Sequence, residues 1–269
     1  MATREHVGVL LRSWRQRRRR TQLELALDAE ISQRHLSFVE SGRASPSREM
    51  LLRLADRLDV PLRDRNALLL AAGFAPVYAE RPIEDAAMAS ARRIIDAILR
   101  AHGPNPALAV DRHWHMVMAN DAVSPLLAGV SDPSLLQAPI NVLRLTLNPG
   151  GLAPHIANLP EWRSHILERL RRQVEVSTDP ALTALLSELA GGSLPAQEPT
   201  GAPVAVADHA VAVPLKLNTR AGLLSLISTT TVFGTATEII LSELVIESFY
   251  PADEASAERL IELQGVKSR

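Results

Sequence analysis

Three polar side chains with complementary hydrogen-bonding chemistry follow one another at residues 33–35. Gln33, Arg34 and His35 come directly after Ser32, a residue type that often caps the amino end of a helix. On a helix that enters the major groove of DNA, arginine pairs bidentately with guanine, and glutamine pairs in the same way with adenine. The chemistry predicted for this segment is therefore the reading of base edges.

Two short helices joined by a tight turn would position these side chains. Thr21 and Glu24 have the spacing of a capping box, which predicts a helix from there to about residue 29. Ser32 begins the next helix and Gly42 ends it. In a helix-turn-helix, the first helix of such a pair lies across the DNA backbone and the second enters the groove.

Further DNA contacts are predicted around the second helix. Gln22, at the amino end of the first helix, is placed to bond a phosphate, and Arg43 follows the second helix. Phe38 lies one turn beyond Arg34, where it can pack on a thymine methyl group or fill the core. The side chains predicted to contact DNA are Gln22, Ser32, Gln33, Arg34, His35, Phe38, Arg43, Arg18 and Arg19.

Charge is distributed unevenly along the chain. Residues 1–75 hold 14 arginines and 9 acidic residues, whereas residues 76–269 hold 15 basic and 21 acidic residues. A basic first segment beside an acidic remainder predicts that only the first segment meets a polyanion. We therefore interpret the arginine run, Arg15 and Arg17–Arg20, as binding phosphate rather than as a solvated charged face.

Composition excludes several other classes of protein. The chain has no cysteine, so it has neither disulfides nor thiolate metal sites. It shows no secretory signal and no run of about 18 apolar residues, so we expect a cytoplasmic protein that does not span a membrane.

Periodicity predicts a multidomain chain. Residues 1–75 form an all-α domain of five helices, residues 76–103 a connector with a linking helix at 91–103, and residues 104–269 an α+β domain. The second domain is predicted to contain a five-stranded antiparallel sheet. Its expected strands are 107–111, 114–120, 204–219, 222–234 and 238–251, and its clearest helices are 161–176, 180–191 and 253–263.

A sheet with helices on one face can enclose an apolar pocket. Trp114, Met116 and Met118 alternate onto one face of a strand, where they line such a pocket or simply fill the core. Arg144 could pair with a ligand carboxylate or with a nearby aspartate, Asp111 or Asp121. The predicted ligand is small and either largely apolar or acidic, a fatty-acid-like molecule for example. The predicted ligand-binding set is Trp114, Met116, Met118, Asn120, Arg144 and Thr229.

Two alternatives concern the same half of the chain. Asp111, His113 and His115 have a spacing that can bind a metal, and His165 with Glu168 forms a second pair. The sequence contains no zinc-protease, phosphate-loop or serine-hydrolase motif, so we expect no metal site, no cofactor and no enzymatic activity. This half could instead serve only as a dimerisation or protein-interaction module.

Residues 7–60 resemble the Xre-type, lambda-repressor-like helix-turn-helix family. The resemblance is carried by Leu11-Arg12, Arg15, Thr21-Gln22, Leu25-Ala26, Ile31-Ser32, Leu36-Ser37, Glu40, Gly42, Pro46 and Leu54-Ala55. In two places the chain departs from the family pattern. Glu30 replaces the usual glycine of the turn and must adopt a left-handed conformation, and Arg20 replaces an apolar residue.

A second resemblance covers the rest of the chain. The segments ALAVDRHWHMVMAN, NVLRLTLNP, LPEWRSHILERLRRQV and LISTTTVFGTATEIILSELVIESFYPAD are similar to those of MmyB-like regulators. This resemblance implies a transcription regulator with a PAS-like ligand-binding domain in its carboxy-terminal half. Helix-turn-helix regulators of this kind bind paired half-sites about 34 Å apart, so we expect a homodimer.

Overall fold

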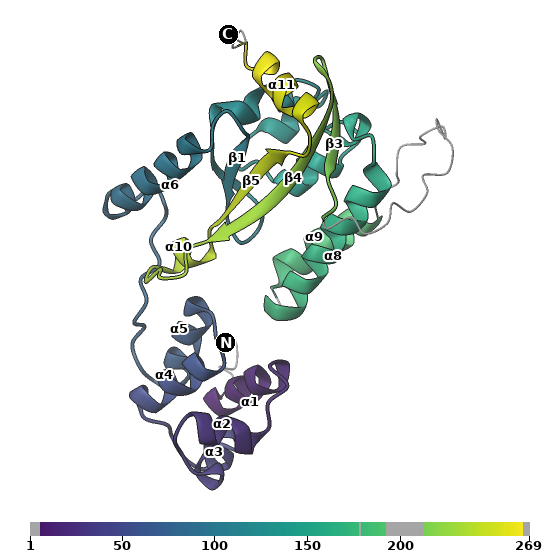
Figure 1. Cartoon of the computed structure of the whole chain (residues 1–269). Coiled ribbons are helices and arrows are strands. Elements are labelled where there is room, and N and C mark those ends of the chain that lie inside the picture. Colours follow the sequence, from purple (N-terminus) through teal and green to yellow (C-terminus); the bar gives the residue numbers. More distant parts are fainter. Residues whose placement is uncertain (1–5, 178, 192–211, 266–269) are drawn as a thin grey trace. The chain divides into compact units, whose positions relative to one another are not determined.

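The computed structural model describes residues 6–177, 179–191 and 212–265 (Figure 1). Its contacts divide the chain into two compact units. The first comprises residues 1–82 together with 234–242, and the second comprises 83–233 together with 243–269. In the described part of the chain, no helix has the combination of length and apolar character that a bilayer crossing requires.

The first unit confirms the predicted five-helix domain. Its helices are α1 (Val7–Arg17), α2 (Gln22–Asp28), α3 (Gln33–Glu40), α4 (Arg48–Arg57) and α5 (Leu62–Ala71). Thr21 and Glu24 form the expected capping box on α2, and the hydroxyls of Ser32 and Ser47 cap α3 and α4. Each cap satisfies a backbone N–H that would otherwise lack a partner, which defines where the helix begins.

Aliphatic side chains at helical spacing build the core of this unit. Leu11, Leu25, Leu36 and Leu54 are all completely buried and come from four different helices. The turn between α2 and α3 contains Glu30 at φ +55°, which confirms the left-handed conformation expected there. A non-glycine residue in that conformation carries a steric cost, which the surrounding packing must offset.

The described residues of the second unit contain one antiparallel sheet of five strands, as predicted. The strands are β1 (Ala107–Val110), β2 (Met116–Ala119), β3 (Leu215–Thr219), β4 (Gly222–Val232) and β5 (Val245–Pro251). Their spatial order is β2-β1-β5-β4-β3. The first hairpin therefore extends the sheet on one side of β5, and the β3–β4 hairpin extends it on the other.

Helices and short 3-10 turns connect and flank the strands. The connecting helix α6 (Ala89–Ala101), predicted at 91–103, contacts β1 and β2. The other elements are η1 (Ala86–Met88), η2 (Asp121–Leu127), η3 (Pro133–Leu136), α7 (Val142–Leu147), η4 (Ala153–His155), α8 (Leu159–Ser177), α9 (Pro180–Gly191) and α11 (Glu254–Leu263). A large hydrophobic core joins buried residues of α8 and α9 to those of β3 and β4.

Two strand predictions need correction. The segment 238–251 is not one strand, because α10 (Ile239–Glu243) precedes β5. The backbone N–H of Ile239 bonds the carbonyl of Ala79, so residues before the strand pair with the connector instead of with the sheet. The strand predicted at 204–219 is confirmed only at its end, in β3, and its residues 204–211 lie outside the described residues.

Candidate functional site

The first turn of α3 presents its polar side chains outward. Gln33 and Arg34 are exposed and His35 is half-buried, whereas Leu36 and Val39 of the same helix are completely buried. The Ser32 hydroxyl accepts a hydrogen bond from the His35 backbone N–H at 3.1 Å. One face of α3 therefore anchors the helix to the core, and the other is available to a partner.

Phe38 lies on the outer side of α3 beside Arg34. The Arg34 guanidinium carbon is 5.4 Å from the centroid of the Phe38 ring. Phe38 is half-buried and lies outside the hydrophobic cluster of this unit as far as the described residues define it. This arrangement keeps an apolar ring next to the candidate base-reading arginine.

A buried ion pair joins α1 to α3. Arg15 and Glu40 are 9% and 7% exposed, and the guanidinium donates two hydrogen bonds to the carboxylate, at 2.6 and 2.8 Å. Hydrogen bonding to Glu40 raises the pKa of Arg15. Gln22 donates to the same carboxylate at 2.8 Å. Arg15 therefore holds helices together, which corrects its assignment to the phosphate-binding run.

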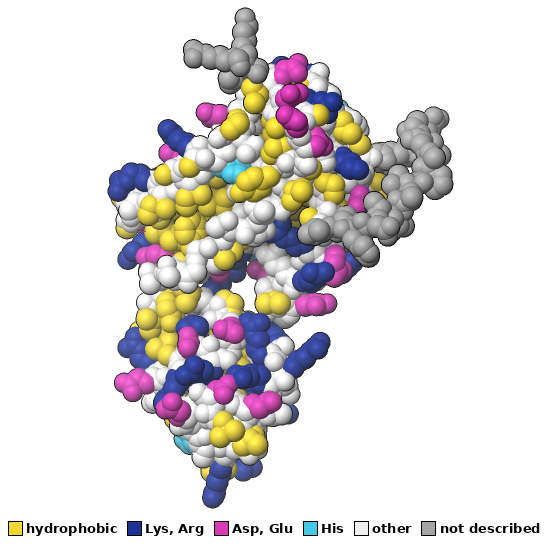
Figure 2. Space-filling model, in the orientation of Figure 1, with side chains coloured by type: hydrophobic (Ala, Val, Ile, Leu, Met, Phe, Trp, Pro, Cys, Tyr) yellow, Lys and Arg dark blue, Asp and Glu magenta, His cyan; other side chains and the backbone are white. Residues whose placement is uncertain are grey.

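The remaining arginines of that run differ in their surroundings. Arg18 donates to the carbonyls of Leu58 and Asp59, both at 2.8 Å, at the end of α4. Arg19 is exposed, and so is Arg43 after α3. Figure 2 shows arginine side chains distributed over the helical unit. Arg19 and Arg43 project into solvent, whereas Arg18 already has two intramolecular acceptors.

The second unit contains two adjoining apolar cavities between the sheet and α7. Their volumes are about 90 and 80 Å³, and both are lined by Leu108, Val142, Thr146 and Phe249. An engineered apolar cavity of about 150 Å³ is known to bind benzene. Each cavity alone is smaller than that, and their four shared lining residues place them side by side, so a molecule of that size would have to occupy both.

The first cavity has one polar wall. Arg169 of α8 forms a bidentate ion pair with Glu247 of β5, and its guanidinium also donates to the Thr230 hydroxyl at 3.0 Å. The guanidinium carbon lies 4.6 Å from the centroid of the Trp114 ring. His165 lines the same cavity, and burial, reinforced by Arg169 and Arg172, lowers its pKa. This wall offers a ligand a neutral imidazole and a balanced ion pair.

Trp114, Met116 and Met118 were predicted to line one pocket, but they do not line the same cavity. Trp114 lies in the turn at φ +68°, lines the first cavity, and donates from its indole N–H to Gln173 at 2.8 Å. A register shift makes Val110 pair with Met116 and Ala109 with Met118, so the regular alternation fails. Met116 lines the second cavity, and Met118 lines neither of the two.

Three other predicted ligand contacts lie outside these cavities. Asn120 uses its side-chain amide to bond the backbone of Leu99, Asn105 and Ala107. Arg144 forms a bidentate ion pair with Glu188 at 2.8 and 2.7 Å, in place of the aspartates suggested from the sequence. Thr229 is exposed on β4, and its neighbour Ser228 lines the first cavity instead.

The sequence interpretation missed the pair Arg169–Glu247, which forms the cavity's polar wall. Glu247 is only 5% exposed and is the one charged residue of a largely apolar strand, β5. A lone carboxylate in such a strand needs a partner of opposite charge, because burying an unpaired charge is very costly. That signal was present in the sequence, but Arg169 is one of several arginines on α8 and its selection required the tertiary structure.

Comparison with known families identifies both units. Residues 11–64 match the helix-turn-helix family, and residues 91–263 match the MmyB-like transcription regulator ligand binding domain. The chain is an MmyB-like transcription regulator. A search of curated proteins finds no match. The regulator thus combines a DNA-binding helix-turn-helix with a ligand-binding domain, and the two cavities lie in the latter.

Proposed function

We propose that the regulator recognises a specific DNA sequence through the amino-terminal turn of α3. The observation that carries this proposal is the contrast between exposed Gln33 and Arg34 and the buried Leu36 and Val39 of the same helix. A helix held in this way can present its first residues to base edges in the major groove. Exposed Arg19 and Arg43 would then contact phosphates, and half-buried Gln22 and His35 would complete the contact surface.

Selection from a random duplex library with the full-length protein tests this proposal. We expect enrichment of one motif, present as two half-sites with centres about 34 Å apart because a homodimer binds them. Affinity for the selected duplex should fall steeply with salt, since each neutralised phosphate contributes about 0.9 to the log–log slope. Failure to enrich any motif at low salt would contradict the proposed function.

We further propose that the two cavities bind a small, largely apolar molecule, with an acyl chain of the fatty-acid type as one suitable chemistry. The first cavity is lined by twelve residues and the second by fourteen, and most of them are aliphatic or aromatic. Such linings favour an apolar ligand. A polar group on the ligand would lie near His165 and Arg169. Binding would change DNA affinity only if the ligand prefers one of two arrangements of the dimer.

A cavity-filling variant tests ligand binding. Leu108→Trp places a larger side chain where the two cavities meet, and we expect native mass spectrometry to show loss of any copurified molecule. The same variant should no longer gain thermal stability from added fatty acids. Ile227→Trp is the matched control, because Ile227 is 36% exposed on β4 and lines neither cavity.

Equal retention of the molecule by both variants would place its binding site elsewhere. If the wild-type protein retains no molecule and no added fatty acid raises its melting temperature, the domain functions without this pocket. That result would favour the alternative in which this domain serves only as a dimerisation or protein-interaction module.

A further inference from the structure

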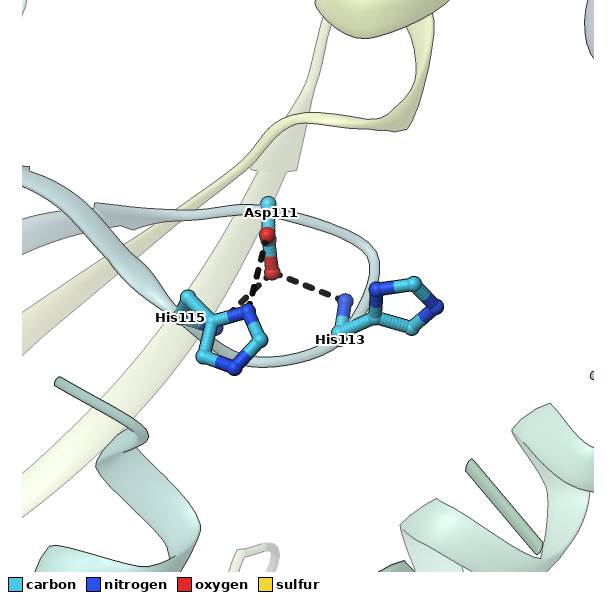
Figure 3. Close-up of side chains that lie close together, drawn as sticks. All are labelled: Asp111, His113 and His115. Carbon is cyan, nitrogen blue, oxygen red and sulfur yellow. Dashed lines mark hydrogen bonds and ion pairs between the residues drawn. The ribbon is translucent and has the colours of Figure 1, made fainter. Parts of the chain in front are cut away.

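The hairpin between β1 and β2 brings together three side chains with metal-binding chemistry. Asp111, His113 and His115 each offer one ligand atom, and these atoms all lie within 4.8 Å of one another. Figure 3 shows the His115 imidazole beside the Asp111 carboxylate and the His113 imidazole farther from it. All three side chains are half-buried, so an ion could reach them from solvent and still be partly shielded by the protein.

The backbone of the hairpin holds this group in place. One Asp111 carboxylate oxygen accepts hydrogen bonds from the backbone N–H groups of His113 and His115, both at 2.8 Å. The other carboxylate oxygen lies 3.1 Å from Nδ1 of His115. Asp111 is therefore fixed relative to both histidines, which lowers the entropic cost of gathering ligands around an ion.

The surroundings of His113 match those of a metal-bound histidine. Its Nε2 lies 2.9 Å from a carboxylate oxygen of Asp179. A histidine that binds a metal almost always donates its second ring N–H to a carboxylate, a carbonyl or a water molecule, which fixes the tautomer. Asp179 lies at the amino end of α9, so a second element of the fold orients the ring.

The charges next to the group favour a cation. Arg112 is the neighbouring positive residue, and it lies 3.5 Å from Asp179 and 3.9 Å from Glu243. Those two carboxylates offset its charge, and Asp111 adds a third negative charge. The local balance is thus negative.

We propose that Asp111, His113 and His115 bind a divalent transition metal ion, with zinc as the probe. Two imidazoles and one carboxylate form a recurrent ligand set for zinc, with a fourth position left for water. Two atoms bound to one ion at about 2.1 Å can be at most about 4.2 Å apart, so a small side-chain rotation closes the site. The sequence alone predicted no metal here, because these residues flank a turn.

The geometry of that turn is what brings the histidines together. Trp114 lies between them with φ +68° and lines the first cavity. The His115 ring lies beside the Asp111 carboxylate, and the His113 backbone N–H bonds the same carboxylate. The proposed metal site therefore shares one hairpin with the cavity, but none of its three ligand residues lines the cavity. Metal binding can be tested independently of any ligand in the cavity.

Zinc titration of the metal-free full-length protein tests this proposal. We expect one equivalent of zinc, measured by calorimetry and by elemental analysis after gel filtration. His115→Ala should abolish stoichiometric binding. Asp179→Asn should weaken it about 10–100-fold, the usual cost of losing the partner that orients a metal-bound histidine. His155→Ala is the matched control, because His155 bonds the carbonyl of Gly129 and is not part of the cluster.

Circular dichroism spectra and melting temperatures without metal establish that each variant is folded. If His115→Ala is not folded, His115→Asn replaces it, and the same loss of binding is expected. The proposal is overturned if the wild-type protein binds neither zinc, cobalt nor nickel stoichiometrically. It is also overturned if the folded variants His115→Ala or His115→Asn bind zinc as tightly as the control.

Discussion

Glu40→Ala is expected to destabilise the helix-turn-helix domain by about 3–5 kcal/mol, because it leaves the Arg15 guanidinium buried without its carboxylate. The substitution also removes the acceptor of the Gln22 side chain, which links the start of α2 to the end of α3. Since domains are typically stable by only about 5–15 kcal/mol, such a loss removes a large part of the domain's stability.

Urea denaturation followed by circular dichroism measures this loss, and DNA affinity should fall with it. Arg12→Ala is the matched control, since Arg12 is an exposed arginine on α1, the same helix as Arg15. Replacing both partners with Arg15→Met and Glu40→Leu should restore most of the stability, because no buried charge then remains unpaired. A Glu40→Ala protein as stable as the Arg12→Ala control would show that this pair does not hold the domain together.

Arg34→Ala is expected to lower discrimination at one base position by about 1–3 kcal/mol. A difference of about 1.4 kcal/mol in binding free energy corresponds to a tenfold difference in affinity. Arg34 is exposed in the first turn of α3, and its guanidinium is positioned by the ring of Phe38. A bidentate contact to guanine would be lost, whereas the wild-type contacts to phosphates would remain. Binding to a duplex library, with each base of the selected motif varied in turn, measures the effect.

Arg43→Ala provides the contrasting variant. Arg43 is exposed after the end of α3, so its loss should weaken binding to every sequence alike. The plot of log binding constant against log salt concentration should also become less steep, by about 0.9 for each Arg43 lost and by twice that value in a dimer. If the two variants gave the same pattern across the library, the assignment of Arg34 to bases and Arg43 to phosphate would be wrong.

Local signals in the sequence were sufficient to predict the helix-turn-helix. Thr21, Ser32 and Ser47 cap helices because their hydroxyls bond backbone N–H groups within three residues, an interaction that needs no distant partner. Local spacing likewise places Leu36 and Val39 on the buried face of α3. The same reasoning predicted five antiparallel strands, since each strand has its own apolar character.

Periodicity was insufficient to predict secondary structure where an apolar segment could form either a strand or a helix. Residues 238–251 were predicted as one strand, but the first part is helix α10. Short apolar runs do not distinguish a strand from a buried helix, and here tertiary contacts decide between them. A local register shift similarly broke the expected alternation of Met116 and Met118.

The sequence by itself determined where helices begin and which helix faces are buried, because these properties depend on neighbours within a few positions. Only the tertiary structure decided the partners of the charged residues. Arg15 pairs with a carboxylate 25 residues away, and Arg169 with one 78 residues away. Many carboxylates could satisfy either guanidinium, and only the packing of helices on one another or on the sheet brings the actual one within reach.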